Sequence, residues 1–162
     1  TSASNIAKAA ANMSEKKIGA LIVIEGGTML GEVLSTGTAV DSAVSSAVIE
    51  NIFFPKAPLH DGAMIIRNNK IYACGCFLPL SYNTSIIRNV GTRHRAAIGM
   101  SENSDAIIVA VSEETGIISV AEGGKLVRNY DKKSLIEELT ANLIEPDTQK
   151  KHIFKKTAGK KQ

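Results

Sequence analysis

The chain has 162 residues, a length that suits one domain able to bury roughly 70% of its unfolded surface without disulfides or a structural metal. Tryptophan is absent and 4% of the residues are aromatic, which argues against a protein that stacks bases on aromatic platforms. The formal charge of +3 comes from six lysines in residues 150–162. The rest of the chain contains the other 13 of the 19 basic residues and all 16 acidic residues. It therefore lacks a positive field suited to nucleic acid.

The first part of the chain is expected to hold two helices and one strand. Residues 6–17 form a helix, because their apolar side chains recur every three or four positions. Residues 20–24 are a buried strand that ends at two glycines, and residues 28–40 are irregular. Asp41 or Ser42 then caps a second helix. The inner face of that helix is expected to carry Val44, Val48 and Ile52.

The second part is expected to combine two hairpins with two more helices. Strands at 64–67 and 71–78 are joined by a tight turn at Asn68-Asn69, because asparagine tolerates a positive φ. A helix begins at Thr92, and another begins after Asp131. The remaining strands are expected at 106–111, 117–121 and 126–128, the last two forming a hairpin around Gly123-Gly124. Because hairpins interrupt the alternation of strand and helix, the sequence predicts an α/β fold: a single domain with a mixed, twisted β-sheet flanked by α-helices.

The two cysteines, Cys74 and Cys76, are expected to face the same side of their strand. Two thiolates are too few to form a zinc site. They are therefore interpreted as a reduced, intracellular pair of small hydrophobic side chains.

The first motif that points to chemistry is His60-Asp61-Gly62-Ala63. An Asp-Gly pair alone is most simply a turn, but here prolines precede it, an imidazole adjoins it and an apolar strand follows. A carboxylate at the start of a strand can hold a divalent ion or accept a proton from a hydroxyl. The small residues Gly62 and Ala63 leave room for a ligand.

The second motif is Gly91-Thr92-Arg93-His94-Arg95, for which a solvated helix end is the alternative interpretation. Two arginines separated by one residue do not share a helical face. At a helix start, however, they can surround a triphosphate together with the Thr92 hydroxyl and free N–H groups. We therefore favour a phosphate site.

The third motif, Ser112-Glu113-Glu114-Thr115-Gly116, follows a buried strand, where open α/β sheets place ligands. Taken alone it is more simply an ordinary acidic hairpin turn. The glycine patterns of P-loop and dinucleotide-binding folds are absent from the sequence.

These motifs stand in a characteristic order: His60-Asp61-Gly62-Ala63, Phe77-Leu78-Pro79-Leu80, Gly91-Thr92-Arg93-His94-Arg95-Ala96-Ala97 and Ser112-Glu113-Glu114-Thr115-Gly116. Together they resemble the catalytic domain of the diadenylate cyclases, in which the Asp-Gly-Ala and Arg-His-Arg triplets are the two signature motifs. The resemblance covers residues from about 18 to 143 and is closest to the membrane-anchored branch. It implies the diadenylate cyclase fold and the condensation of two ATP into cyclic di-AMP and two pyrophosphates.

The resemblance also implies roles for single residues. Asp61 would help to hold a divalent metal, Mn²⁺ or Mg²⁺ with Co²⁺ as a further candidate, and would promote attack by a ribose 3′-hydroxyl. His60 and Glu114 are further candidate metal ligands. The catalytic candidates are Asp61, Arg93, His94 and Arg95. The candidates for substrate binding are Gly62, Ala63, Leu78, Gly91, Thr92, Arg93, Ser112 and Glu113.

The same resemblance gives a linker helix at 1–17 and a catalytic domain at 18–145. The composition of residues 146–162 predicts a lysine-rich, disordered tail. No signal peptide or transmembrane run is recognisable, and the chain begins with Thr1. We expect a piece of a longer protein whose membrane anchor precedes this sequence and whose catalytic domain is cytoplasmic.

One site that holds one ATP cannot close a ring of two bonds, so the reaction is expected to need a face-to-face homodimer. The alternative function is a module that senses ATP or a cyclic dinucleotide without turnover. Nucleic-acid binding would depend on the tail alone.

Overall fold

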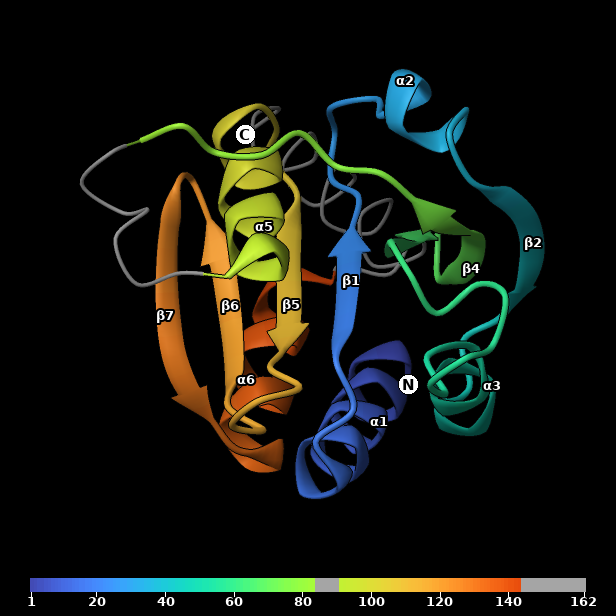
Figure 1. The fold of residues 1–162 in the computed structure, drawn as a ribbon, viewed down its shortest axis with the longest axis vertical. Helices are drawn as coiled ribbons and strands as arrows, with labels where there is room; N and C mark the ends of the chain where they lie inside the picture. The colour runs from blue at the N-terminus through green and yellow to red at the C-terminus, as the bar shows by residue number, and fades with distance from the viewer. Residues whose placement is uncertain (84–90, 144–162) are drawn as a thin grey trace, which may run out of the picture.

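The structure, a computed structural model, describes residues 1–83 and 91–143. The described residues form a seven-stranded sheet with helices on both faces (Figure 1). The helices are α1 (Ser2–Lys16), α2 (Gly31–Leu34), α3 (Ser46–Ile52), α5 (Thr92–Glu102) and α6 (Lys132–Asn142). The strands are β1 (Ala20–Ile24), β2 (Thr38–Ala43), β3 (Ala63–Arg67), β4 (Lys70–Cys76), β5 (Ile107–Val111), β6 (Ile118–Glu122) and β7 (Lys125–Tyr130).

The strands lie in the order β2-β4-β3-β1-β5-β6-β7. Within the described residues the central pair, β1 and β3, is parallel, and the other neighbouring pairs are antiparallel. The predicted mixed α/β fold is therefore confirmed. These directions bring the starts of β1, β3 and β6 and the ends of β4, β5 and β7 to one edge of the sheet, where the site is found.

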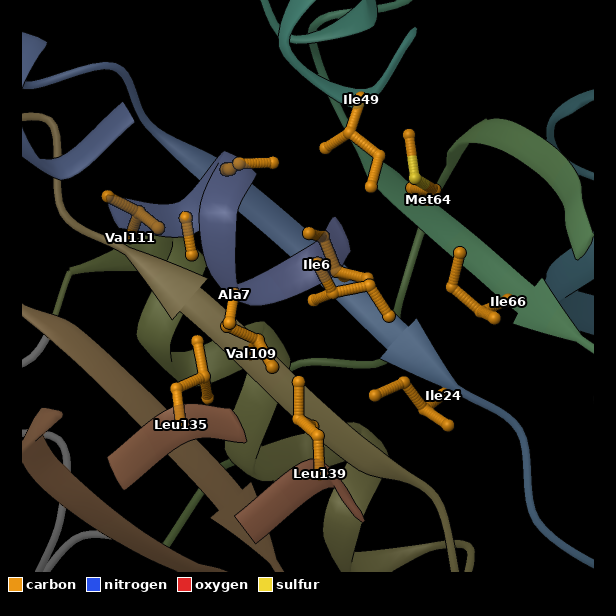
Figure 2. Packing of buried hydrophobic residues seen from close by; sticks show 14 of the residues in the cluster. Ile6, Ala7, Ile24, Ile49, Met64, Ile66, Val109, Val111, Leu135 and Leu139 are labelled. Carbon is orange, nitrogen blue, oxygen red and sulfur yellow. The ribbon is translucent and has the colours of Figure 1, made fainter. Parts of the chain in front are cut away.

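Apolar side chains fill the space on both faces of the sheet. On one face α1, α3 and α6 cover the strands, and Ile6 of α1, Ile49 of α3 and Leu135 of α6 are fully buried (Figure 2). On the other face α5 packs against a second cluster, to which it contributes Ala96 and Ala97. The central strands β1 and β5 are buried on both sides, which explains their continuous apolar runs.

The segment predicted to be irregular, 28–40, contains α2 and the start of β2. Its side chains are mostly exposed, so the hydrophobic pattern gave no signal for an edge strand. The helix expected after Asp41 or Ser42 begins later, because Ser45 is the residue whose side chain caps it. Ile49 is its buried residue.

The prediction for the inner face of that helix was partly wrong. Val44 and Ile52 pack against the core, but Val48 is 36% exposed. The later start of the helix shifts the face that it presents to the sheet.

The expectation that both cysteines share one face is wrong. Cys74 packs with the α1 side of the sheet and Cys76 with the α5 side, and both are free, buried thiols. Gly75 between them has φ +67°, and the register with β3 shifts there, so a bulge reverses the alternation. Burial raises the pKa of the Cys74 thiol to about 12, with a smaller contribution from Cys76, which keeps it protonated.

The predicted turns and the last helix are confirmed. Asn68 and Asn69 join β3 to β4 with positive φ angles, and Gly123 and Gly124 do the same between β6 and β7. Asp131 caps α6 and forms a reciprocal capping box with Ser134. The predicted tail at 146–162 lies outside the described residues.

Candidate active site

A cavity of about 610 Å³ lies at the edge of the sheet where α5 begins. Its walls come from segments far apart in the sequence: the turn before β3, the end of β4, the start of α5, the loop after β5, and β7. The polar and charged lining consists of Asp61, Thr92, Arg93, His94, Ser112, Glu113, Glu114, Thr115 and Arg128. The remaining lining consists of Leu21, Gly62, Cys76, Phe77, Leu78, Leu80, Gly91, Ala96 and Ile117.

Asp61 is exposed at one end of this cavity because the chain turns sharply before β3. Gly62 has φ +101°, and a Cβ there would lie 2.8 Å from the backbone of Gly75 and Cys76. The turn therefore requires glycine for its conformation and for its close approach to β4. The carboxylate is left at the rim, with no ion-pair partner among the residues that the structure describes.

The start of α5 forms a second wall. Gly91 is the N-cap residue and supplies no side-chain cap, so the N–H groups of the first turn are open to a ligand at the positive end of the helix dipole. Thr92 and Arg93 line the cavity at this point. The Arg93 guanidinium packs over Gly19, where an added Cβ would lie 2.6 Å from Cζ and both Nη atoms. Because Gly19, between α1 and β1, has no side chain, the Arg93 guanidinium can lie against its backbone.

His94 is half-buried in the same wall. Its pKa is lowered from 6.5, first by burial and then by the positive charges of Arg128 and Arg93, while Glu114 acts in the opposite direction. The imidazole is therefore neutral at pH 7. It can donate or accept one hydrogen bond without adding a third positive charge beside the arginines.

An NMR titration of the imidazole carbons is expected to give His94 a midpoint below 6.5. Because the unfolded chain binds that proton more readily, the free energy of unfolding should fall as the pH drops through this region. Arg128→Met should raise the His94 midpoint by removing one of the two nearby cations. A midpoint at or above 6.5 in the unmodified chain would contradict this electrostatic description.

The loop after β5 forms the third wall. The Ser112 Oγ accepts hydrogen bonds from the backbone N–H groups of Glu114 and Thr115, which holds both glutamates at the cavity. The carbonyl of Gly116 accepts a hydrogen bond from the Ser14 hydroxyl of α1. The predicted residues of this motif are therefore brought to the same cavity as the other two motifs.

Three sequence candidates lie outside the cavity lining. The His60 Nδ1 is 2.6 Å from the carbonyl oxygen of Ala57, and Ala63 is buried in the core. Arg95 donates to the carbonyl of Ser81 and lies over the ring of Tyr82. Arg95 thus positions the segment after β4 against α5 rather than reaching the cavity.

A metal site with three or more His, Cys, Asp or Glu ligands is not formed by the described residues, so the expected set of Asp61, His60 and Glu114 does not come together. The carboxylates of Asp61 and Glu114 nevertheless line one cavity. Such an oxygen donor set suits Mg²⁺ or Mn²⁺, which are commonly bound by one or two carboxylates and complete their coordination with phosphate and water.

Sequence reasoning missed three polar or exposed contributions to the cavity. Phe77, 64% exposed at the end of β4, and Thr115, in the loop after β5, belong to recognised motifs but were assigned no role. Arg128 received none because its strand shows no motif, and only the sheet order brings β7 to this edge.

Comparison with known proteins agrees with this arrangement. Residues 7–126 match the family DAC, described as DisA bacterial checkpoint controller nucleotide-binding. The chain is 48% identical over 136 residues to the cyclic di-AMP synthase CdaA of Bacillus subtilis, covering 84% of this chain and 50% of that protein. It is 41% identical over 157 residues to a diadenylate cyclase of Listeria monocytogenes, covering 97% of this chain and 58% of that protein. The chain thus spans little more than half the length of these relatives.

Two solved structures show the same fold. A double mutant of DacA from Staphylococcus aureus superposes with a TM-score of 0.84 at 47% identity, covering 86% of this chain and 93% of the other. A protein described as a hypothetical membrane spanning protein from Bacillus cereus gives a TM-score of 0.77 at 45% identity, covering 80% of this chain and 64% of the other. In the part of this chain that the structure describes, no helix has the length and apolar character needed to cross a membrane. Sequence motifs, fold and comparisons agree, and the chain belongs to the DAC family of diadenylate cyclase domains.

Proposed function

We propose that this chain is the catalytic domain of a diadenylate cyclase, which condenses two ATP into cyclic di-AMP and two pyrophosphates. The observation that carries the proposal is the convergence of Asp61, the start of α5 and the Ser112 loop on one cavity. The cavity contains the Asp61 carboxylate, the guanidinium groups of Arg93 and Arg128, and the N–H groups at the start of α5. These groups suit a nucleotide whose hydroxyl and phosphates both react.

The end of the cavity near Asp61 suits the nucleoside. Leu78 and Gly62 line it, and Phe77 exposes a ring on which a base can stack. Thr92, Arg93 and the N–H groups of α5 suit the phosphates, because they offer charge-assisted and dipole-oriented hydrogen bonds. Asp61 is then placed to accept the proton of an attacking 3′-hydroxyl.

The carboxylates of Asp61 and Glu114 would hold a divalent cation, Mn²⁺, Mg²⁺ or Co²⁺. That ion supplies neutralisation of phosphate charge. Arg93 adds to it from the helix side, and the site as a whole orients the hydroxyl toward phosphorus.

Each nucleotide must attack the other, so two cavities must face one another. A twofold dimer achieves this with one set of residues. The open rim at Asp61 and Phe77, both exposed, is the part of the cavity that a second copy would face.

We propose that in its longer parent protein this domain is tethered to the cytoplasmic side of a membrane.

The test is incubation of the purified chain with ATP and Mn²⁺ or Mg²⁺, followed by mass analysis of nucleotides and measurement of released pyrophosphate. Two pyrophosphates per cyclic di-AMP are expected, with specific activity that falls on dilution as dimers dissociate. Saturable ATP binding without any product would instead support a sensing module and overturn the catalytic proposal.

Gly19→Ala should impair the same reaction without unfolding the chain. The added Cβ would lie 2.6 Å from the Arg93 guanidinium, which is the mobile end of a long side chain and can move aside. We expect kcat/KM for ATP to fall about 10-fold, the effect of weakening one charged hydrogen bond, with an unchanged melting temperature.

Gly31→Ala is the matched control for this prediction, because no atom lies within 4 Å of the Cβ that it would add. It should leave both kcat/KM and the melting temperature unchanged. A Gly19→Ala enzyme with full activity would show that the observed position of Arg93 is not needed.

A further inference from the structure

Arg128 of β7 lines the cavity, although no motif of the sequence contains it. It pairs in register with Ser119 of β6, which pairs with Ala110 of β5, which in turn pairs with Leu21 of β1. Residues directly opposite one another in a sheet share a face. Arg128 therefore belongs to the face that α5 covers, the same face as the cavity.

The backbone next to Arg128 is specialised. Asn129 has φ 70°, a left-handed conformation that is uncommon outside glycine, and the pairing of β6 with β7 shifts at this residue. The shift is a bulge, since Leu126 packs on the α5 side and Tyr130 on the α1 side. Bulges of this kind re-aim side chains near active sites. Here the bulge leaves Arg128 on the cavity side and returns Tyr130 to the core.

An arginine on an edge strand can simply protect that edge from aggregation. Two observations favour a ligand instead. Within residues 1–83 and 91–143 no carboxylate lies within ion-pair distance of the Arg128 guanidinium. Although exposed, Arg128 also lines the cavity, where its charge acts on His94 at the start of the facing helix.

The sheet order gives the position of Arg128 relative to the reacting end. Asp61 precedes β3, and β7 lies four strands away through β1, β5 and β6. Neighbouring strands are about 4.8 Å apart, so the wall that carries Asp61 and the wall that carries Arg128 are separated by roughly 19 Å. The start of α5 lies between them, because α5 packs against β5 and β6. A nucleoside at the Asp61 end would therefore direct its phosphate chain along α5 toward β7.

We propose that Arg128 binds the β- and γ-phosphates of ATP, the part that leaves as pyrophosphate. This inference rests on the proposed function. The 3′-oxygen of the partner nucleotide forms a bond to the α-phosphorus, and its proton passes to the Asp61 carboxylate. The bond from the α-phosphorus to the oxygen that bridges to the β-phosphate breaks, and its electron pair stays on that oxygen. Arg128 stabilises the charge that develops there.

The experiment compares three ligands on the full chain by calorimetry: ATP with Mg²⁺, pyrophosphate with Mg²⁺, and cyclic di-AMP, which has no β- or γ-phosphate. Arg128→Met should weaken binding of ATP and of pyrophosphate about 10- to 100-fold, the effect of losing a hydrogen-bonded charge. Binding of cyclic di-AMP should change less than about two-fold. Arg128→Lys should recover part of the loss, because a lysine keeps the charge but not the paired donors.

Lys125→Met is the matched control: it removes one positive charge from the exposed start of the same strand, outside the cavity lining, and should leave all three affinities unchanged. Equal weakening of all three ligands in Arg128→Met would indicate general damage to the site and overturn the proposal. Unchanged ATP and pyrophosphate binding would overturn it as well.

Product formation by the unmodified chain is measured separately. If that chain makes no cyclic di-AMP, the proposed function fails, and pyrophosphate binding by the Arg128 variants still decides the phosphate site. If it makes cyclic di-AMP while Arg128→Met binds pyrophosphate normally, this inference alone fails.

Discussion

Asp61→Asn is expected to lower the rate of cyclic di-AMP formation by about 10²- to 10⁴-fold, the range for loss of a positioned general base. Asparagine has nearly the same shape but cannot accept the proton of the attacking hydroxyl, and it is a weaker ligand for a divalent cation. The side chain is exposed, so the free energy of unfolding should change by less than about 0.5 kcal/mol. Initial rates by chromatography, with thermal unfolding followed by circular dichroism, measure the two effects separately.

Asp41→Asn is the control for that experiment, because it makes the same chemical change on an exposed residue of β2. Asp41 has φ 51°, which asparagine tolerates, and its carboxylate is 3.5 Å from the Lys70 Nζ in an exposed pair that contributes little stability. It should keep full activity. If Asp61→Asn retained full turnover, the proposed role of this carboxylate would be wrong.

Gly99→Ala should destabilise the fold. In a helix interior alanine is normally more favourable than glycine by about 0.8–1.0 kcal/mol, so the reason must lie outside the helix. The added Cβ would lie 2.1 Å from the carbonyl oxygen of Pro79 and 2.7 Å from the backbone nitrogen of Ser81. These are backbone atoms, held against α5 by the hydrogen bond from the Ser81 N–H to the carbonyl of Arg95. Overpacking of this kind costs about 1–3 kcal/mol, so we expect a net loss of stability.

The same change should reduce activity, because the segment it displaces carries Leu78 and Leu80 into the cavity. Urea unfolding gives the loss of stability, and steady-state rates at a temperature where the variant remains folded give the loss of activity. Gly31→Ala again provides the control. A Gly99→Ala protein more stable than the parent would show that the segment after β4 can move away from α5 without cost.

Much of the fold could be predicted from local patterns. The buried strands β1 and β5 show as short apolar runs, the asparagine pair marks the hairpin between β3 and β4, and the cap of α6 is visible at Asp131. Such signals succeed because each depends on residues close together in the sequence. The edge strand β2 was missed since few of its side chains are buried, so that no apolar alternation marks it.

Long-range geometry was beyond prediction from the sequence. The separation of Cys74 from Cys76 depends on a bulge at Gly75 that pairing with β3 imposes. Among the proposed site residues, Arg95 is adjacent to His94 in the sequence, but the turn of the helix directs it to Ser81 instead of the cavity. A motif identifies which residues are close along the chain, not which side of the helix each one occupies.

By itself the sequence determined the mixed α/β class, the order of most elements and the three motifs that meet at the site, because hydrophobic periodicity, turn residues and motif spacing are local properties. Only the tertiary structure showed that the Arg93 guanidinium packs against Gly19. It also showed that His60 and Ala63 lie outside the cavity lining and that Arg128 of β7 belongs to it. Those facts depend on strand order and on contacts between distant segments. Such contacts form only when the sheet assembles.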